Sequence, residues 1–246
     1  MKKLITLLFL LATAFLFQSC ESKTEAKKAT SNNITESNVE EEVEMEEETF
    51  NDEMLVYPKT GKNATDFLPK IDIYEIQYEV KGDLNNDGLT DIAVVFRHKE
   101  VKTAQRPTLI LLQNKDKTYR LDKISDVAMP AEYYQYEQDY YKLYDIEEIS
   151  IENGELNIKL YNKDDALGAF KYSGKDFILT YKEHFYRGAG QQHGTKYDFA
   201  KGEETTTEII FDYNDDYKPK STVTTSPLKK ERHLFENTAI SEYFED

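Results

Sequence analysis

Beyond about residue 54, short runs of β-branched and aromatic residues follow one another, with a turn signal after nearly every run. Residues 92–96 (IAVVF) and 108–112 (TLILL) are continuously apolar, which at this length is typical of buried strands. Residues 71–80 alternate in part between apolar and polar. We therefore expect a mainly β fold, with short helical pieces near 66–68 and 133–143.

The turn signals predict hairpins. Asn153-Gly154 separates two alternating runs, and both residues tolerate the positive φ that a two-residue hairpin turn requires. Residues 173–176 (SGKD) and Lys201-Gly202 separate two further pairs of runs, and a polar turn at 114–117 returns the chain toward 108–112. Consecutive hairpins indicate an antiparallel meander. We expect a single β-rich domain over 54–246, with the Gly-rich segment 188–194 as a flexible loop.

The loop at 83–91 carries the clearest chemical signal. Side chains with oxygen atoms occupy its positions 1, 3, 5 and 9, a glycine stands at position 6 where the chain must turn, and position 7 would offer a backbone carbonyl. Calcium takes six to eight oxygen ligands, and such alternation supplies them. We predict that one structural Ca²⁺ binds here. A metal-free turn is the alternative, because Asn-Asp-Gly is also good turn chemistry. The predicted ligands are Asp83, Asn85, Asp87, Leu89 and Asp91.

The flanks of this loop indicate strands rather than helices. An EF-hand would need Glu at position 12, where Val94 stands within an apolar run. The loop instead resembles the D-x-[DN]-x-D-G-x-x-D calcium loops of FG-GAP and VCBS-type repeats. With the segments EVKGDLNNDGLTDIAVVF, RPTLILLQNKDKTYRL and ISIENGELNIKLY, the chain over roughly 66–208 is similar to a family of bacterial secreted proteins and lipoproteins with one such loop. The resemblance implies a structural calcium ion and no established catalytic activity.

The first 19 residues indicate a targeting signal that is not part of the fold. Lys2 and Lys3 precede an apolar stretch at 4–17 that is short for a membrane-spanning helix, and Ser19 stands directly before Cys20. This arrangement resembles the lipobox of bacterial lipoproteins, which implies that Cys20 is acylated. An ordinary signal peptide is the alternative. We expect residues 1–19 to be a lipoprotein signal peptide and Cys20 to anchor the protein in the membrane. The location would be the cell envelope, at the outer membrane, facing the periplasm or the exterior.

Charge sets further limits. Residues 21–53 hold 12 Asp and Glu against 3 Lys, so we expect 20–53 to be a disordered acidic linker that holds the domain away from the membrane. The whole chain has 47 acidic and 31 basic residues, and its net charge of −16 argues against binding to nucleic acid. Its single cysteine excludes an internal disulfide framework and a cysteine-based metal site.

Other candidate site residues give weaker signals. Six tyrosines lie within 133–144, either as an aromatic cover over the sheet or as a patch that binds a protein or a glycan. The histidines form no zinc-binding motif, and no G-x-S-x-G nucleophile motif occurs. A catalytic carboxylate pair cannot be recognised from spacing alone. The four histidines are His98, His184, His193 and His233.

These features favour a lipid-anchored binding module that is not an enzyme, with one structural calcium ion and a protein or glycan partner. The alternative is a hydrolase acting on envelope polysaccharide or peptidoglycan, with carboxylates as catalysts and the tyrosines as a platform for sugars.

Overall fold

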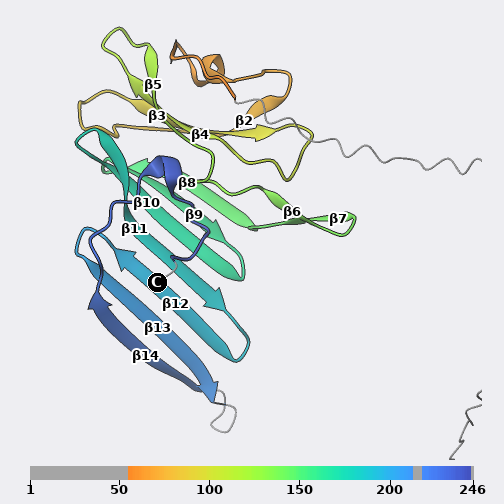
Figure 1. Cartoon of the computed structure of the whole chain (residues 1–246), viewed down its shortest axis with the longest axis vertical. Helices are drawn as coiled ribbons and strands as arrows, with labels where there is room; N and C mark the ends of the chain where they lie inside the picture. The colour runs from red at the N-terminus through yellow and green to blue at the C-terminus, as the bar shows by residue number, and fades with distance from the viewer. Residues whose placement is uncertain (1–54, 213–217, 245–246) are drawn as a thin grey trace, which may run out of the picture. The chain divides into compact units, whose positions relative to one another are not determined.

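The computed structural model describes residues 55–212 and 218–244, which build a β-rich domain (Figure 1). Antiparallel strands form three sheets within these residues, joined by hairpins and accompanied by two short 3-10 helices. The expected mainly β fold is confirmed. The predicted signal peptide, Cys20 and the acidic linker lie outside the described residues. In the two described ranges, no helix is long and apolar enough to cross a membrane.

The first sheet has five strands in the order β1-β5-β4-β3-β2, all paired antiparallel. A 3-10 helix, η1 (Ala64–Phe67), follows β1 and lies close to the helical piece expected at 66–68. The strands of this sheet are β1 (Thr60–Gly61), β2 (Tyr74–Gly82), β3 (Asp91–His98), β4 (Thr108–Gln113) and β5 (Tyr119–Ser125).

Strands β3 and β4 are buried on both faces of this sheet. Ala93 and Val95 of β3 pack into the cluster shared with the second sheet. Val94 and Phe96 pack into a separate cluster on the opposite face, together with Phe67 of η1. Burial on both faces explains why these strands read as unbroken apolar runs rather than as alternating ones.

The second sheet has seven strands whose order in space equals their order in the chain, β8 to β14. At the β8–β9 turn, Asn153 and Gly154 have φ of 54° and 75°, as the two-residue hairpin turn requires. Gly174 and Gly202 also have positive φ in the next predicted turns. The strands are β8 (Ile146–Glu152), β9 (Glu155–Tyr161), β10 (Asp164–Ser173), β11 (Asp176–Arg187), β12 (Gln191–Asp198), β13 (Glu203–Asp212) and β14 (Lys218–Pro227).

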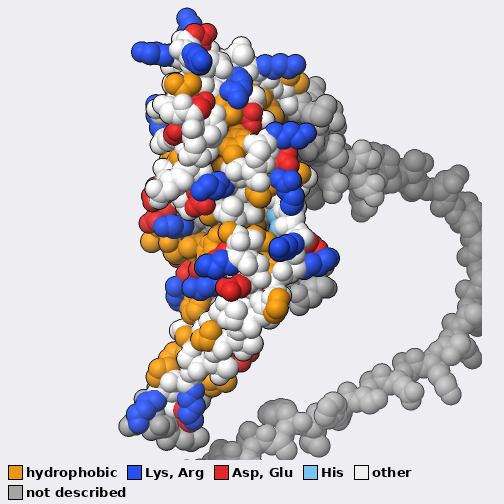
Figure 2. All heavy atoms as spheres, turned by 90° about the vertical axis from the view of Figure 1, so that its left-hand side faces the viewer, with side chains coloured by type: hydrophobic (Ala, Val, Ile, Leu, Met, Phe, Trp, Pro, Cys, Tyr) orange, Lys and Arg blue, Asp and Glu red, His pale blue; other side chains and the backbone are white. Residues whose placement is uncertain are grey.

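The two sheets share one apolar core. Ile110 and Leu112 of β4 meet Leu156, Ile158 and Leu160 of β9 in the same buried cluster. At the other end of the second sheet, every residue of β14 is exposed. Figure 2 shows mostly uncharged side chains on the visible face of this end, in keeping with the Thr- and Ser-rich strands β13 and β14.

Residues 233–244, here called the C-terminal strap, lie against the core face of β10 and β11. The backbone N–H of Leu179 donates to the carbonyl of His233 at 2.9 Å. Phe235, in the 3-10 helix η2 (Phe235–Asn237), and Ile240 are fully buried in the shared core. A Cβ added to Gly168 of β10 would lie 2.4 Å from Cγ2 of Ile240, so the strap depends on this glycine for its close approach.

Two local predictions are wrong. Residues 133–143 form no helix but a hairpin of β6 (Tyr133–Tyr136) and β7 (Asp139–Lys142), because Glu137 adopts a positive φ of 54° and reverses the chain. The expected flexible loop at 188–194 is shorter than predicted. His193 and Gly194 belong to β12, where they pair with both β11 and β13.

Candidate functional site

The loop at 83–91 joins β2 to β3, and the pair Gly82–Asp91 closes it. Strands flank it on both sides, as the sequence predicts. Asn86 and Gly88 have φ of 60° and 82°, and these two left-handed residues let the chain reverse within the loop.

The side chains at loop positions 1 and 3 both contact the backbone of position 5. Asp83 accepts hydrogen bonds from the N–H groups of Asp87, at 3.1 Å, and Gly88, at 2.8 Å. The Oδ1 atom of Asn85 accepts from the same Asp87 N–H at 3.0 Å. One amide therefore gathers two of the predicted ligand oxygens toward the inside of the loop.

Asp87 extends this network to the remaining part of the loop. Its Oδ1 accepts from the N–H of Leu89 at 2.8 Å, and its Oδ2 accepts from the side-chain amide of Asn85 at 3.0 Å. Four of the five predicted ligands are thus tied together before any ion is considered. Backbone amides of the loop hold the carboxylates of Asp83 and Asp87 in place. The same arrangement occurs in stable turns that bind no metal.

Asp91, the fifth predicted ligand, is fully buried. Its Oδ2 accepts from the N–H of Leu84 and its Oδ1 from the N–H of Gln113, each at 2.9 Å. Burial raises the pKa of this carboxyl, while the backbone donors lower it and the charge of nearby Asp87 raises it further. Asp91 therefore links the loop to β4, at a cost in desolvation that a nearby cation would reduce.

The residues of the loop fit calcium in their chemistry. Three carboxylates stand within nine residues, and none forms a salt bridge with another described residue. All the donors are hard oxygens, as calcium prefers. Throughout 55–212 and 218–244, no three Asp, Glu, His or Cys side chains gather into a metal-binding group. Calcium binding by this loop stays a prediction.

The loop also lies against the second sheet. A Cβ added to Gly154, in the β8–β9 turn, would lie 3.1 Å from Oδ1 of Asn86. A Cβ added to Gly82 would lie 2.4 Å from Cγ2 of Ile151 on β8. An ion that fixed this loop would therefore act where the two sheets meet.

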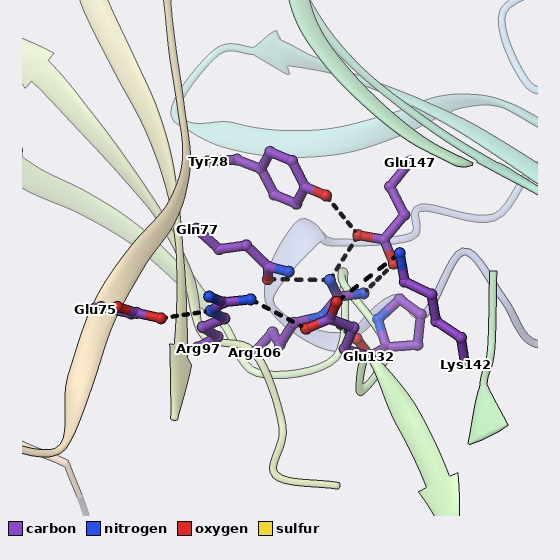
Figure 3. Close-up of polar contacts among 9 residues, drawn as sticks. Glu75, Gln77, Tyr78, Arg97, Arg106, Glu132, Lys142 and Glu147 are labelled. Atoms are coloured by element: carbon purple, nitrogen blue, oxygen red, sulfur yellow. Dashed lines mark hydrogen bonds and ion pairs between the residues drawn. The ribbon is translucent and has the colours of Figure 1, made fainter. Parts of the chain in front are cut away.

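A buried ion pair forms a second polar centre, which the sequence does not reveal (Figure 3). The guanidinium of Arg106 donates to both oxygens of Glu147 on β8, at 2.7 and 2.9 Å. Both side chains are at most 2% exposed. Gln77 and Tyr78 of β2 also contact the pair, since Gln77 accepts from Arg106 and the Tyr78 hydroxyl donates to Glu147, while Nε of Arg106 donates to the carbonyl of Pro130. Burial, and next the charge of Glu147, raise the pKa of Tyr78 to about 12.

A more exposed group of charges adjoins this pair. Arg97 of β3 donates to Glu75 at 2.7 Å and lies 3.5 Å from Glu132. Lys142 of β7 lies 3.9 Å from the same Glu132. Figure 3 shows these side chains converging from β2, β3 and the hairpin formed by β6 and β7. Glu132 therefore connects the base of that hairpin to the first sheet.

The four histidines belong to four different elements of the fold. His98 accepts from the backbone N–H groups of Glu100 and Val101 in the turn after β3. His184 is buried on β11, His193 lies on β12, and His233 begins the strap. The hydrolase alternative stays a prediction.

Comparisons of the chain with protein-family models, with curated proteins and with solved structures find no match.

Proposed function

We propose that this protein is a lipid-anchored component of the bacterial cell envelope whose β-rich domain binds one structural calcium ion and serves as a binding module without enzymatic activity. The uncompensated charge of the 83–91 loop carries the calcium part of the proposal. Three carboxylates are held within nine residues, one of them fully buried, with no salt bridge from the rest of the described chain. A divalent cation would balance that charge and relieve the desolvation of Asp91.

The position of the loop supports a structural role for the ion. Its backbone and side chains contact β4 through Asp91 and the β8–β9 turn through Asn86. Binding energy available only in the folded state adds directly to stability. We therefore expect calcium to stabilise the contact between the sheets rather than to act on a substrate.

Thermal unfolding of the full-length protein in detergent, first in EDTA and then with calcium, tests this role. Calcium at about 100 times its Kd adds about 2.7 kcal/mol, which for a domain of this size raises the midpoint by about 5–10 °C. Asp87→Ala should abolish the rise because it removes a ligand from the centre of the loop. Magnesium should have a much smaller effect, since it loses its water reluctantly.

The matched control is Asp116→Ala, which removes an acidic turn residue between β4 and β5 that also accepts backbone and hydroxyl hydrogen bonds. This variant should keep the full calcium response. An unchanged midpoint for the wild-type protein at every calcium concentration would show that the loop is only a turn.

A further inference from the structure

The hairpin of β6 and β7, here called the tyrosine hairpin, exposes aromatic rings to water. Tyr134, Tyr136, Tyr140 and Tyr141 are each between 45% and 63% exposed. The rings of Tyr134 and Tyr141 are stacked across the two strands, with centroids 5.6 Å apart and planes 27° from parallel. The hairpin forms its own two-stranded sheet and extends away from the two larger sheets (Figure 1). These rings therefore contribute little to the core of the domain.

The strand register places tyrosines on both faces of this hairpin. Tyr134 pairs with Tyr141 on one face, while Tyr133 and Tyr140 lie on the other. Lys102, from the loop after β3, covers that second face, with its Nζ 5.5 Å from the ring centroid of Tyr133 and 5.4 Å from that of Tyr140. A cation over two aromatic rings holds the ring faces in place and keeps a positive charge at the root of the hairpin.

A cavity of about 160 Å³ opens at this root, and its lining is rich in basic side chains. Arg97, Lys99, Lys102 and Arg106 contribute four positive charges, against the single negative charge of Glu132. Adding the ion-pair partners of this lining, which are Glu75, Glu147 and Lys142, gives five positive and three negative charges, a net charge of +2. The chain as a whole carries −16. This basic cavity is therefore a locally positive region of a protein whose net charge is strongly negative.

The basic cavity retains positive charge that the protein itself does not neutralise. Lys99 donates to the backbone carbonyl of Ile71, which is uncharged. Lys102 meets aromatic rings and forms no ion pair with any described residue. Arg106, by contrast, is fully engaged with Glu147 and only forms a wall. Lys99 and Lys102 are thus the groups that can receive an anion from solvent.

We propose that the tyrosine hairpin and the basic cavity together bind an anionic polysaccharide, with one acidic substituent in the cavity and the polymer continuing around the edge of the hairpin, so that further sugar rings stack on Tyr134 and Tyr141 of the opposite face. Pyranose rings have flat apolar C–H faces and polar edges, which match exposed tyrosine rings flanked by water. The cavity is small and most of its lining side chains are charged, so it suits a carboxylate or phosphate group rather than the apolar anchor of a protein interface. The proposal names the partner class of the binding module proposed above and rests on that function.

Binding of hyaluronate, a polymer of pyranose rings with carboxylates, tests the proposal on the full-length protein in detergent. The comparison polymers are methyl-esterified hyaluronate, which lacks the charge, and poly-glutamate, which lacks the rings. We expect calorimetry to show binding of hyaluronate that is at least tenfold tighter than that of either comparison polymer. Binding should weaken as salt is raised, because charges partly exposed to water are screened.

Two variants separate the parts of the surface. Lys102→Glu should weaken hyaluronate binding by about tenfold, equivalent to about 1.4 kcal/mol, whereas Lys175→Glu, at an exposed turn of the second sheet, should change it less than twofold. The double variant Tyr134→Ser/Tyr141→Ser should also weaken binding by about tenfold. Circular dichroism melting of each variant checks that the fold is retained, and Tyr134→Phe, which keeps the ring, should bind as the wild type does.

Equal binding of poly-glutamate and hyaluronate would overturn the proposal in favour of an acidic protein partner. Absence of hyaluronate binding, or binding that Lys102→Glu leaves unchanged, would overturn the site itself. The measurement is made with and without calcium. Failure of polymer binding in a protein that calcium still stabilises would leave the calcium role intact, so that the two failures are distinguishable.

Discussion

At the scale of single residues, negative charge is stabilised in two different ways in this domain. The carboxylates of the 83–91 loop accept hydrogen bonds from backbone amides and have no cationic partner among the described residues. Glu147 has a guanidinium partner that donates to both of its oxygens. The first arrangement leaves charge for an external ion, whereas the second is complete within the protein. The two sites should therefore respond differently to mutation and to calcium.

Removal of one partner of the buried pair should be strongly destabilising. Arg106→Met leaves the charge of Glu147 buried and unpaired, which typically costs about 3–5 kcal/mol. The double variant Arg106→Met/Glu147→Met removes both charges and should recover most of that loss. Denaturant titration of both variants measures the difference. A double variant as unstable as the single one would mean that the cost comes from lost packing and not from an uncompensated charge.

Sequence reasoning recognises the first arrangement and not the second. The spacing from Asp83 to Asp91 lies within one loop, so the local pattern contains it. Arg106 and Glu147 are 41 residues apart and meet only because β8 packs beside β2. Tyr78 and Gln77 join them for the same reason. No local pattern specifies how two sheets will pack, and such a pair therefore cannot be predicted from one sequence.

At the scale of elements, turns decide which predictions succeed. The Asn153-Gly154 hairpin follows from residues that favour positive φ, and it forms as expected. At 133–143 the tyrosine spacing is compatible with either helix or strand, and the reversal occurs at Glu137, which is not a typical turn residue. The sequence of β14 contains no strand signal, since Thr- and Ser-rich strands at a sheet edge lack the apolar alternation that marks buried ones.

The C-terminal strap covers a titratable group, which makes it sensitive to acid. His184 is 2% exposed and stacks on Tyr243 of the strap, with ring centroids 4.3 Å apart. The pKa of His184 is lowered to about 4, mainly by burial and secondly by the positive charge of neighbouring Lys182. A hydrogen bond with the backbone of Glu242 acts in the opposite direction and raises it. Because the unfolded chain takes up this proton near pH 6.5, stability should fall as the pH decreases from 6.5 to about 4.

The variant His184→Phe should reduce this acid sensitivity while keeping the stacked ring. A difference of about 2.5 pH units between folded and unfolded pKa corresponds to roughly 3 kcal/mol of stability lost across that window. Melting curves between pH 7 and pH 4 compare the variant with the wild type. Thr195→Val, which alters the neighbouring position on β12, should keep the wild-type dependence. Identical pH profiles for His184→Phe and the wild type would contradict this account.

At the scale of the whole molecule, attachment and binding would be divided between separate parts of the chain. The predicted anchor at Cys20 and the acidic stretch at 21–53 precede the domain, and the tyrosine hairpin belongs to the domain itself. If Cys20 is acylated, one part of the chain would attach the protein to the membrane and another part would bind the partner.

Anchoring predicts a defined outcome for Cys20→Ala. In a bacterium that processes lipoproteins, the full-length wild-type protein should incorporate labelled fatty acid and sediment with membranes. The variant should not incorporate the label, because the thiol that accepts the lipid is absent. It should also no longer sediment with the membranes. Lys23→Ala, three residues further on, serves as the control and should behave as the wild type. A wild-type protein without label would contradict lipidation.

The C-terminal strap also determines when the domain can complete its folding. Each neighbouring pair in the second sheet is a hairpin, so its strands can pair in the order in which they occur in the chain. Phe235 and Ile240, however, follow every strand in the chain and still fill the core beside β10 and β11. That part of the core stays open to water until these two residues dock, and exposed apolar surface in this period favours aggregation. The vulnerable form of this protein is thus the chain whose strands have paired and whose last core residues have not yet docked.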